Sequence, residues 1–328
     1  MVASGIATLT SVSKTHAVLA VGTASGGTSP YHYQWYRSST GGFTPGAGNI
    51  ISGATSTTLT DTPPGSGPWF YQNVITDSAG TPATATSNQV GAFLDTGTNV
   101  SFIAVGDSIF SGYLNNGGSN TNTNGIDPIT YAATMLAGST KVRSIAFTNQ
   151  AYAGTYTTDW APASAKLNAA ISAGAALSPA ATIAVIEMGA NDTNTSVRRS
   201  PATMYANMQA TCNALVTAGF TVLVFESCYA YPGAYGGTWD NQSSGDLAQY
   251  NALLPGIDNG TTIRFIGGNF YAWSIDNYLS STLYNTDHVH PSALGDQVLG
   301  GAIANAISNL VDPSVSGSGS TGGHIIGG

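Results

Sequence analysis

The stretch of sequence that decides the fold is Val100-Ser101-Phe102-Ile103-Ala104-Val105, followed at once by Gly106-Asp107-Ser108-Ile109. A short apolar run bounded by a turn residue predicts a buried strand. The Gly-Asp-Ser at its end would lift a serine hydroxyl out at the carboxyl edge of a sheet, where open α/β sheets bind their ligands. The tripeptide alone is common, and by itself it is explained somewhat better by a serine that caps a helix N-terminus.

From Val100 onward, strand patterns alternate with helix patterns. We expect strands over 100–105, 142–147, 182–187, 221–226 and 263–266, and helices over 128–136, 161–174, 201–218, 246–254 and 291–310. Such alternation predicts a parallel sheet with helices on both faces. Pro201 and Pro291 each suit a first helical turn. The apolar stripe from Leu294 to Leu310 predicts a last helix packed on the sheet.

Residues 1–95 follow a different pattern, in which runs rich in Val, Thr and Tyr alternate with Gly/Ser/Pro turns. The expected strands cover 16–21, 31–36, 57–60 and 69–75, and regular short strands of this kind indicate a β-sandwich. Trp35 in a Tyr-x-Trp-Tyr strand and Tyr71 resemble the immunoglobulin-like pattern, without its paired cysteines. We expect an all-β immunoglobulin-like domain over 1–95 that binds or serves as a spacer, and a linker over 91–99.

Composition narrows the class of protein. Charged residues are 7 % of the 328, against roughly 25 % in an ordinary soluble domain. This favours an extracellular, cell-surface or virion-associated protein. The net charge of -8 gives no basic footprint for nucleic acid. We expect no membrane insertion, because Ser172, Gly174 and Pro179 break the most apolar stretch, and Met1–Ile6 does not read as a signal peptide.

The two cysteines, Cys212 and Cys228, form no Cys-x-x-Cys or Cys/His cluster, so the sequence predicts no zinc site. A disulfide is possible. We expect two buried free thiols instead, because Cys212 falls within a predicted helix and Cys228 at the end of the next strand.

A serine hydroxyl attacks only when a base takes its proton and a third group orients that base. Within residues 100–312 the histidines are His288 and His290, in Asp287-His288-Val289-His290-Pro291. We expect His290 as the base, because Asp287 lies three residues before it. His288 is the competitor, although its adjacency to Asp287 makes orientation harder, and a plain turn is the alternative for the whole motif.

The oxyanion of such a reaction needs hydrogen-bond donors. Gly154, in the loop after the second expected strand, offers a backbone N–H, and Asn191, after the third, offers an amide. Each alone is more often an ordinary turn residue. Four loops of one sheet edge that carry complementary roles make a stronger signal than any one of them.

These stretches resemble, in chain order, the four sequence blocks of the SGNH/GDSL hydrolase family: Gly106-Asp107-Ser108-Ile109, Gly154, Gly189-Ala190-Asn191-Asp192 and Asp287-His288-Val289-His290. The resemblance covers residues 100 to about 310. It implies a flavodoxin-like three-layer α/β fold over 96–312. Ile109 replaces the usual Leu, and Ala151 stands where the second block usually has a glycine, which weakens the assignment of Gly154.

The resemblance also implies roles for five residues. Ser108 is the nucleophile, His290 the base, and Asp287 the group that orients His290. The backbone N–H groups of Ser108 and Gly154, with the side-chain amide of Asn191, form the oxyanion hole. No metal and no organic cofactor is implied.

The expected substrate is an ester, and we favour acetyl groups on a glycan. Aromatic faces and amides near the site suit sugar rings, although they could equally cover a core edge: Tyr113, Asn115, Asn116, Tyr152, Tyr156, Trp160, Tyr229, Tyr231, Tyr235 and Trp239. The sequence contains no long apolar segment that could form a lid, and this argues against a lipase. We expect Arg198 and Arg199 to be a solvated pair. The alternatives are that they bind an acidic sugar or pair with Asp192.

Two alternatives stay open. The chain could be a phage virion or cell-surface structural protein that uses this fold mainly for binding, with a virion or cell-surface partner on residues 1–95. The same site could also transfer acyl groups or cleave thioesters, because these reactions share the acyl-enzyme. Residues 313–328 read as a flexible Gly/Ser-rich tail.

Overall fold

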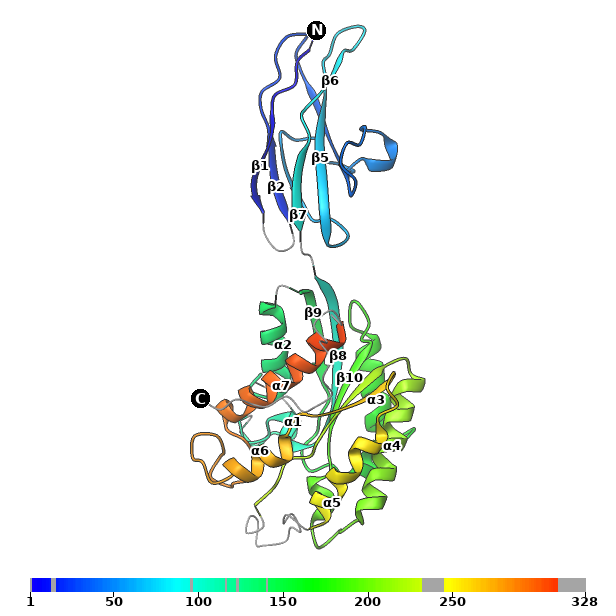
Figure 1. The fold of residues 1–328 in the computed structure, drawn as a ribbon, viewed down its shortest axis with the longest axis vertical. Helices are drawn as coiled ribbons and strands as arrows, with labels where there is room; N and C mark the ends of the chain where they lie inside the picture. Colours follow the sequence, from blue (N-terminus) through cyan, green and yellow to red (C-terminus); the bar gives the residue numbers. More distant parts are fainter. Residues whose placement is uncertain are drawn as a thin grey trace. The chain divides into compact units, whose positions relative to one another are not determined.

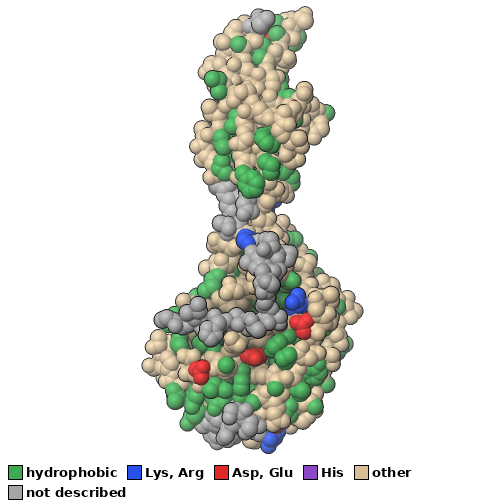
Figure 2. Space-filling view, in the orientation of Figure 1, with side chains coloured by type: hydrophobic (Ala, Val, Ile, Leu, Met, Phe, Trp, Pro, Cys, Tyr) green, Lys and Arg blue, Asp and Glu red, His purple; other side chains and the backbone are tan. Residues whose placement is uncertain are grey.

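The structure is a computed structural model that describes residues 2–12, 16–94, 97–115, 117–121, 124–139, 141–231 and 245–311. The chain divides into two compact units, Met1–Thr98 with Thr140–Arg143, and Asn99–Ser139 with Ser144–Gly328 (Figure 1). The expected tail over 313–328 lies outside the described residues. Few charged side chains are visible in the space-filling view of either unit (Figure 2), as the low charged fraction requires.

The first unit consists of two antiparallel sheets. One has the order β1-β2-β4, and the other has β3-β5-β6 with β7 also paired to β5. The strands are β1 (Ala7–Val12), β2 (Ala17–Val21), β3 (His32–Ser38), β4 (Thr58–Asp61), β5 (Gly67–Thr76), β6 (Thr84–Thr86) and β7 (Val90–Leu94), with a short 3-10 turn at Ala47–Asn49. Strands β2 to β5 are the four that the sequence predicted. The core includes Trp35 and Tyr71, both fully buried.

The expected linker over 91–99 is wrong. Its first half is the end of β7, where Gly91 pairs with Phe70 and Leu94 with Gly67. The physical reason is a period of two: Ala92 and Leu94 face the core, whereas Phe93 is 71 % exposed. Gly91, the first residue of the expected linker, therefore lies within an antiparallel pair.

The second unit is built on a parallel sheet with the strand order β12-β11-β10-β8-β9. Its strands are β8 (Thr98–Gly106), β9 (Val142–Asn149), β10 (Ile183–Glu187), β11 (Thr221–Phe225) and β12 (Ile263–Gly267). The pairs β8/β10, β10/β11 and β11/β12 are parallel. Numbered along the chain, this is the flavodoxin-like order 2-1-3-4-5, so the expected three-layer α/β fold is confirmed.

Helices cover both faces of this sheet, with α2 and α7 on one side and α3, α4 and α5 on the other (Figure 1). They are α1 (Ser108–Ser111), α2 (Pro128–Gly138), α3 (Ala165–Ala175), α4 (Pro201–Thr217), α5 (Asp246–Leu253), α6 (Phe270–Asn277) and α7 (Ala293–Val311), with 3-10 turns at Thr157–Trp160, Ala190–Thr193 and Leu254–Ile257. Pro201 opens α4 as predicted, whereas α7 begins two residues after Pro291.

Helix α6 was not predicted, because the glycine pair Gly267-Gly268 reads as a break in the chain. Both glycines have positive φ, and Asn269 at φ 54° begins the helix. The cysteines agree with expectation: Cys212 on α4 and Cys228 after β11 are free and buried.

Candidate active site

Ser108 is the first residue of α1, directly after the tight turn that ends β8. Asp107 is the N-cap of α1, and its Oδ1 accepts a hydrogen bond from the Ile109 N–H at 3.0 Å. Glycine is required at 106, because a Cβ there would lie 2.3 Å from the carbonyl oxygen of Glu187. Because Asp107 supplies the cap, the alternative explanation of Ser108 as a helix cap is wrong.

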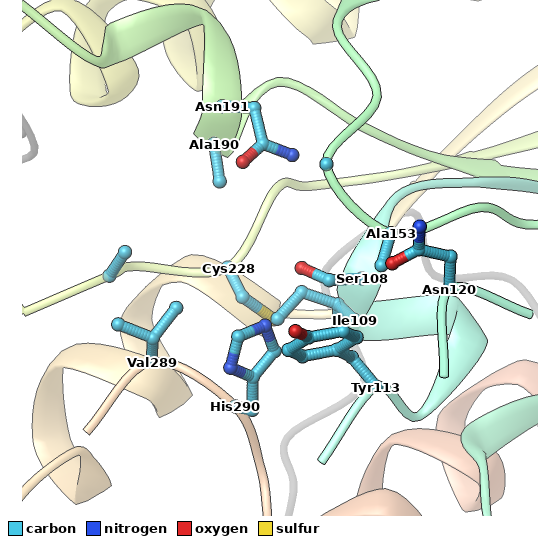
Figure 3. A pocket seen from close by; sticks show the side chains of 12 residues that line it. Ser108, Ile109, Tyr113, Asn120, Ala153, Ala190, Asn191, Cys228, Val289 and His290 are labelled. Atoms are coloured by element: carbon cyan, nitrogen blue, oxygen red, sulfur yellow. The ribbon is translucent and has the colours of Figure 1, made fainter. Parts of the chain in front are cut away.

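A cavity of about 220 Å³ opens beside this turn (Figure 3). Four of the five predicted site residues line it, namely Ser108, Gly154, Asn191 and His290. In Figure 3 the side chains of Ser108 and His290 lie close together, and Asn191 faces them across the cavity. The other lining residues are Ile109, Tyr113, Asn120, Ala153, Ala190, Cys228, Ala230 and Val289.

Asp287, the fifth predicted residue, lies behind His290. The Nδ1 atom of His290 is 2.6 Å from Asp287 Oδ2, and Asp287 Oδ1 accepts the N–H groups of Val289 and His290 at 3.1 Å each. Burial raises the pKa of Asp287, but the hydrogen bond and charge of His290 outweigh it and lower the pKa to about 2. An ionised Asp287 keeps the proton on Nδ1, so Nε2 is the nitrogen that can accept one.

His288, the competing base, does not line the cavity. Its Nδ1 lies 2.8 Å from the carbonyl oxygen of Tyr278, and its backbone has a φ of 57°. The ring packs edge-on against Tyr231, with ring centres 5.9 Å apart. The geometry therefore pairs Asp287 with His290, as the spacing predicted.

Two residues support His290 in ways that the sequence did not signal. The Tyr113 ring lies 5.2 Å from the imidazole, centre to centre. Asn115, expected to face substrate, instead donates to Asp296 Oδ2 at 2.6 Å and to the carbonyl of Pro291 at 3.1 Å. Asn115 thus ties the loop after Ser108 to the loop that carries His290.

Gly154 and Asn191 face the cavity from two separate loops. Gly154 has φ +78°, and a Cβ there would meet nothing within 4 Å, so its backbone is open to the cavity. Asn191 Nδ2 donates one hydrogen to the carbonyl of Thr155 at 2.9 Å. That bond fixes the amide and leaves its second N–H for a ligand.

Asp192 joins these two loops. It is fully buried and accepts the N–H of Thr157 at 2.8 Å and the Thr157 hydroxyl at 2.7 Å, with Arg199 at 3.4 Å. Burial raises its pKa. The expectation of a solvated arginine pair is wrong for Arg199, whose guanidinium lies against Asp192. Arg198, 54 % exposed, pairs with Asp246 at 2.6 Å.

Besides Asn115, two of the expected sugar-facing residues are buried and do not line the cavity. Trp160 is 1 % exposed and donates its indole N–H to Thr155 Oγ1, so it is a core residue. Tyr229 is also buried. Of the ten residues, Tyr113 lines the cavity, whereas Asn116, Tyr235 and Trp239 lie outside the described residues. Asn120, Cys228 and Val289 line the cavity without having been predicted.

Two features are absent from the described segments. They contain no cluster of three or more His, Cys, Asp or Glu side chains placed to hold a metal ion. No helix within them has the length and apolar character needed to cross a bilayer.

A flavodoxin-like sheet with a serine-lined cavity at its carboxyl edge defines the class of protein. Residues 104–298 match the model of the GDSL-like Lipase/Acylhydrolase family, and the chain belongs to this family. Membership makes the protein an esterase or acylhydrolase. No curated protein sequence matches this chain.

Solved structures share the fold of the second unit. A lipase/acylhydrolase from Enterococcus faecalis is 18 % identical with a TM-score of 0.50, and the match covers 65 % of this chain and 98 % of that one. A carbohydrate acetylesterase from Sinorhizobium meliloti is 18 % identical (TM-score 0.47; 65 % and 100 % covered), and an aryl esterase from M. smegmatis is 16 % identical (0.48; 64 % and 99 %). At these identities the likeness concerns the fold alone.

Proposed function

We propose that this protein hydrolyses carboxylic esters through an acyl-enzyme on Ser108. The observation that carries the proposal is the placement of His290, which is bonded to Asp287 through Nδ1 and lies beside Ser108 in one cavity. These three side chains come from chain positions about 180 residues apart, and their proximity at one sheet edge supports the proposal.

In the first half of the reaction, Ser108 Oγ attacks the ester carbonyl carbon while His290 Nε2 takes the hydroxyl proton. The carbonyl π bond opens to an oxyanion that accepts hydrogen bonds from the N–H groups of Ser108 and Gly154 and from Asn191 Nδ2. Collapse of this intermediate breaks the bond to the alcohol, which leaves with the proton from His290. Water then repeats the sequence and releases the acid.

The acyl group in this proposal is short. A cavity of about 220 Å³ is smaller than the roughly 300–1,000 Å³ that drug-sized ligands occupy. Ala153, Ala190 and Val289 give it apolar walls, which suit a methyl group. We therefore favour acetyl esters, and hydrolysis rather than acyl transfer because water needs no acceptor site.

The alcohol in this proposal is a sugar hydroxyl. Tyr113 and Asn120 line the cavity, and the Asn120 amide donates to the Tyr152 hydroxyl at 3.3 Å. Lys166 lies over the Tyr152 ring, 3.5 Å from its centre. An aromatic face, an amide and a hydroxyl beside one opening match the apolar faces and polar edges of a sugar ring.

For the first unit we propose an immunoglobulin-like sandwich that binds or serves as a spacer at an extracellular, cell-surface or virion location. Its two antiparallel sheets, with fully buried Trp35 on β3, support the immunoglobulin-like assignment. The organisation we propose is a sandwich over 1–95, a hydrolase domain over 96–312 and a tail over 313–328. The low charged fraction supports the location.

The test is release of acetate from an acetylated polysaccharide by the wild type, compared with cleavage of long-chain p-nitrophenyl esters. We expect acetate release, weak long-chain cleavage, and loss of both in Ser108→Ala. Ser172→Ala, at an exposed serine on α3, is the matched control and should keep full activity. Equal rates for wild type and Ser108→Ala would favour the alternative of a binding protein, and long-chain cleavage without acetate release would overturn the glycan assignment.

A further inference from the structure

Two fully buried carboxyl groups lie beneath the turn that carries Ser108. Asp107 precedes the serine directly, and Glu187 is the last residue of β10, the strand beside β8. Glu187 pairs in register with Gly106, so the two acids come from adjacent strand ends. Both residues are 0 % exposed.

Each of the two groups keeps one oxygen for which the described residues supply no donor. Asp107 Oδ1 accepts from Ile109 at 3.0 Å, and Oδ2 accepts from nothing. Glu187 Oε1 accepts from the Cys228 N–H at 3.4 Å, and Oε2 accepts from nothing. The register of β8 and β10 places the two carboxyl groups next to each other, so that a hydrogen bond between them can form, and the Ser227 side chain also lies beside Glu187. Two carboxylates cannot form that bond, but a carboxylic acid and a carboxylate can.

We propose that Glu187 is a positioning residue that stays protonated and donates its hydrogen to Asp107, which fixes the turn that holds Ser108. One shared proton satisfies both orphaned oxygens. Asp107 then keeps its bond to Ile109, and the first turn of α1 keeps its cap. Glu187 acts through Asp107 and touches no substrate.

The surroundings explain why the proton stays on Glu187. Burial and the nearby charge of Asp107 raise the pKa of Glu187 well above its usual range. Burial also raises the pKa of Asp107, but the Ile109 N–H and the charge of His290 favour its ionised form. The other groups that face the pair are neutral or acidic: Asp192, Ser227, Cys228, Tyr250 and Tyr284.

The consequence for catalysis rests on the proposed function. Loss of the shared proton would place a second negative charge below Ser108 and its N–H, where the oxyanion forms. Like charges on neighbouring groups repel each other strongly in a site from which water is excluded. Turnover should therefore fall as pH rises through the pKa of Glu187, while a glutamine at that position keeps a donor and carries no charge.

The first experiment measures the proton itself by infrared difference spectroscopy at pH 7. We expect the C=O stretch of a protonated carboxyl group in the wild type, its loss in Glu187→Gln, and its retention in Asp276→Asn, a matched control at an exposed acid on α6. A spectrum in which Glu187→Gln removes no such band overturns the proposal. This result does not depend on ester hydrolysis, so a failure of the proposed function would leave it standing.

The second experiment compares pH profiles of kcat. Glu187→Gln should stay within about threefold of wild type at pH 7 and lack the alkaline fall, whereas Glu187→Leu, which removes the donor, should lose about tenfold or more. Glu226→Gln is the same substitution at the end of β11 and should keep the wild-type alkaline limb. Identical alkaline limbs in wild type and Glu187→Gln would contradict the proposal.

Discussion

The two units differ in how some of their buried acids find hydrogen-bond partners. In the first unit Asp61 pairs with Arg37 and accepts the Tyr71 hydroxyl at 3.0 Å. In the second unit Asp107, Glu187 and Asp296 each keep a buried oxygen without a donor among the described residues. Burial raises the pKa of all three.

This difference separates a structural use of charge from a functional one. A buried charge that is fully paired holds a fold together, whereas an unsatisfied buried group is costly and needs an explanation. The acids with an unsatisfied oxygen lie near Ser108 and His290: Asp107 and Glu187 lie under the turn that carries Ser108, and Asp296 bonds Asn115, which reaches the loop of His290. In our proposal these acids therefore lie next to the residues that carry the chemistry.

Of the substitutions that test this difference between the units, Ser108→Ala should have the largest effect on activity. Loss of the nucleophile should lower kcat by on the order of 10⁶-fold, with no change in thermal unfolding because Ser108 Oγ supports no other described contact. Steady-state hydrolysis of p-nitrophenyl acetate measures the rate, and calorimetry measures the fold. Retained activity would show that the nucleophile is not Ser108.

The next effect comes from Asn191→Ala, which removes an amide that we propose donates to the oxyanion. One such donor is worth about 3–4 kcal/mol in the transition state, so kcat should fall roughly 10²- to 10³-fold while KM changes little. Asn168→Ala, on α3, removes an amide outside the cavity and is the control. Equal kcat in wild type and Asn191→Ala would remove this residue from the oxyanion hole.

The sequence was informative where one physical signal dominated. Five apolar runs predicted the strands of the parallel sheet. Local motifs after strand ends pointed to Ser108, Asn191 and His290, which the structure places around one cavity, with Asp287 bonded to His290. What it missed depends on contacts between distant residues. From the sequence Asn115 is expected to face the substrate, but in the structure it donates to Asp296, 181 residues later. Glu187 reads as an ordinary strand end until Asp107 faces it.

A smaller effect is expected from Asn115→Ala, which breaks the link between the two loops. Asp296 would lose its side-chain donor, which should cost about 1–3 kcal/mol in the free energy of unfolding. Activity should also decrease, because the loop that holds His290 loses an anchor. Chemical denaturation and kcat measure the two effects. A stability loss without any change in kcat would limit Asn115 to a structural role.

The smallest effect on catalysis is expected in the first unit. Tyr71→Phe removes a hydrogen bond to the Asp61 carboxylate and should lower the stability of that unit by about 1–3 kcal/mol. kcat on a small ester should stay at the wild-type value, because the site lies wholly in the second unit. A fall in kcat on p-nitrophenyl acetate would show that the first unit contributes to the chemistry.

The most direct test of the account is covalent labelling with a serine-reactive phosphonate, read by mass spectrometry of the digested protein. The account predicts one adduct, on the peptide that contains Ser108, with labelling much slower in His290→Ala and abolished in Ser108→Ala. An adduct on another serine, or equal labelling of Ser108 with and without His290, would contradict it.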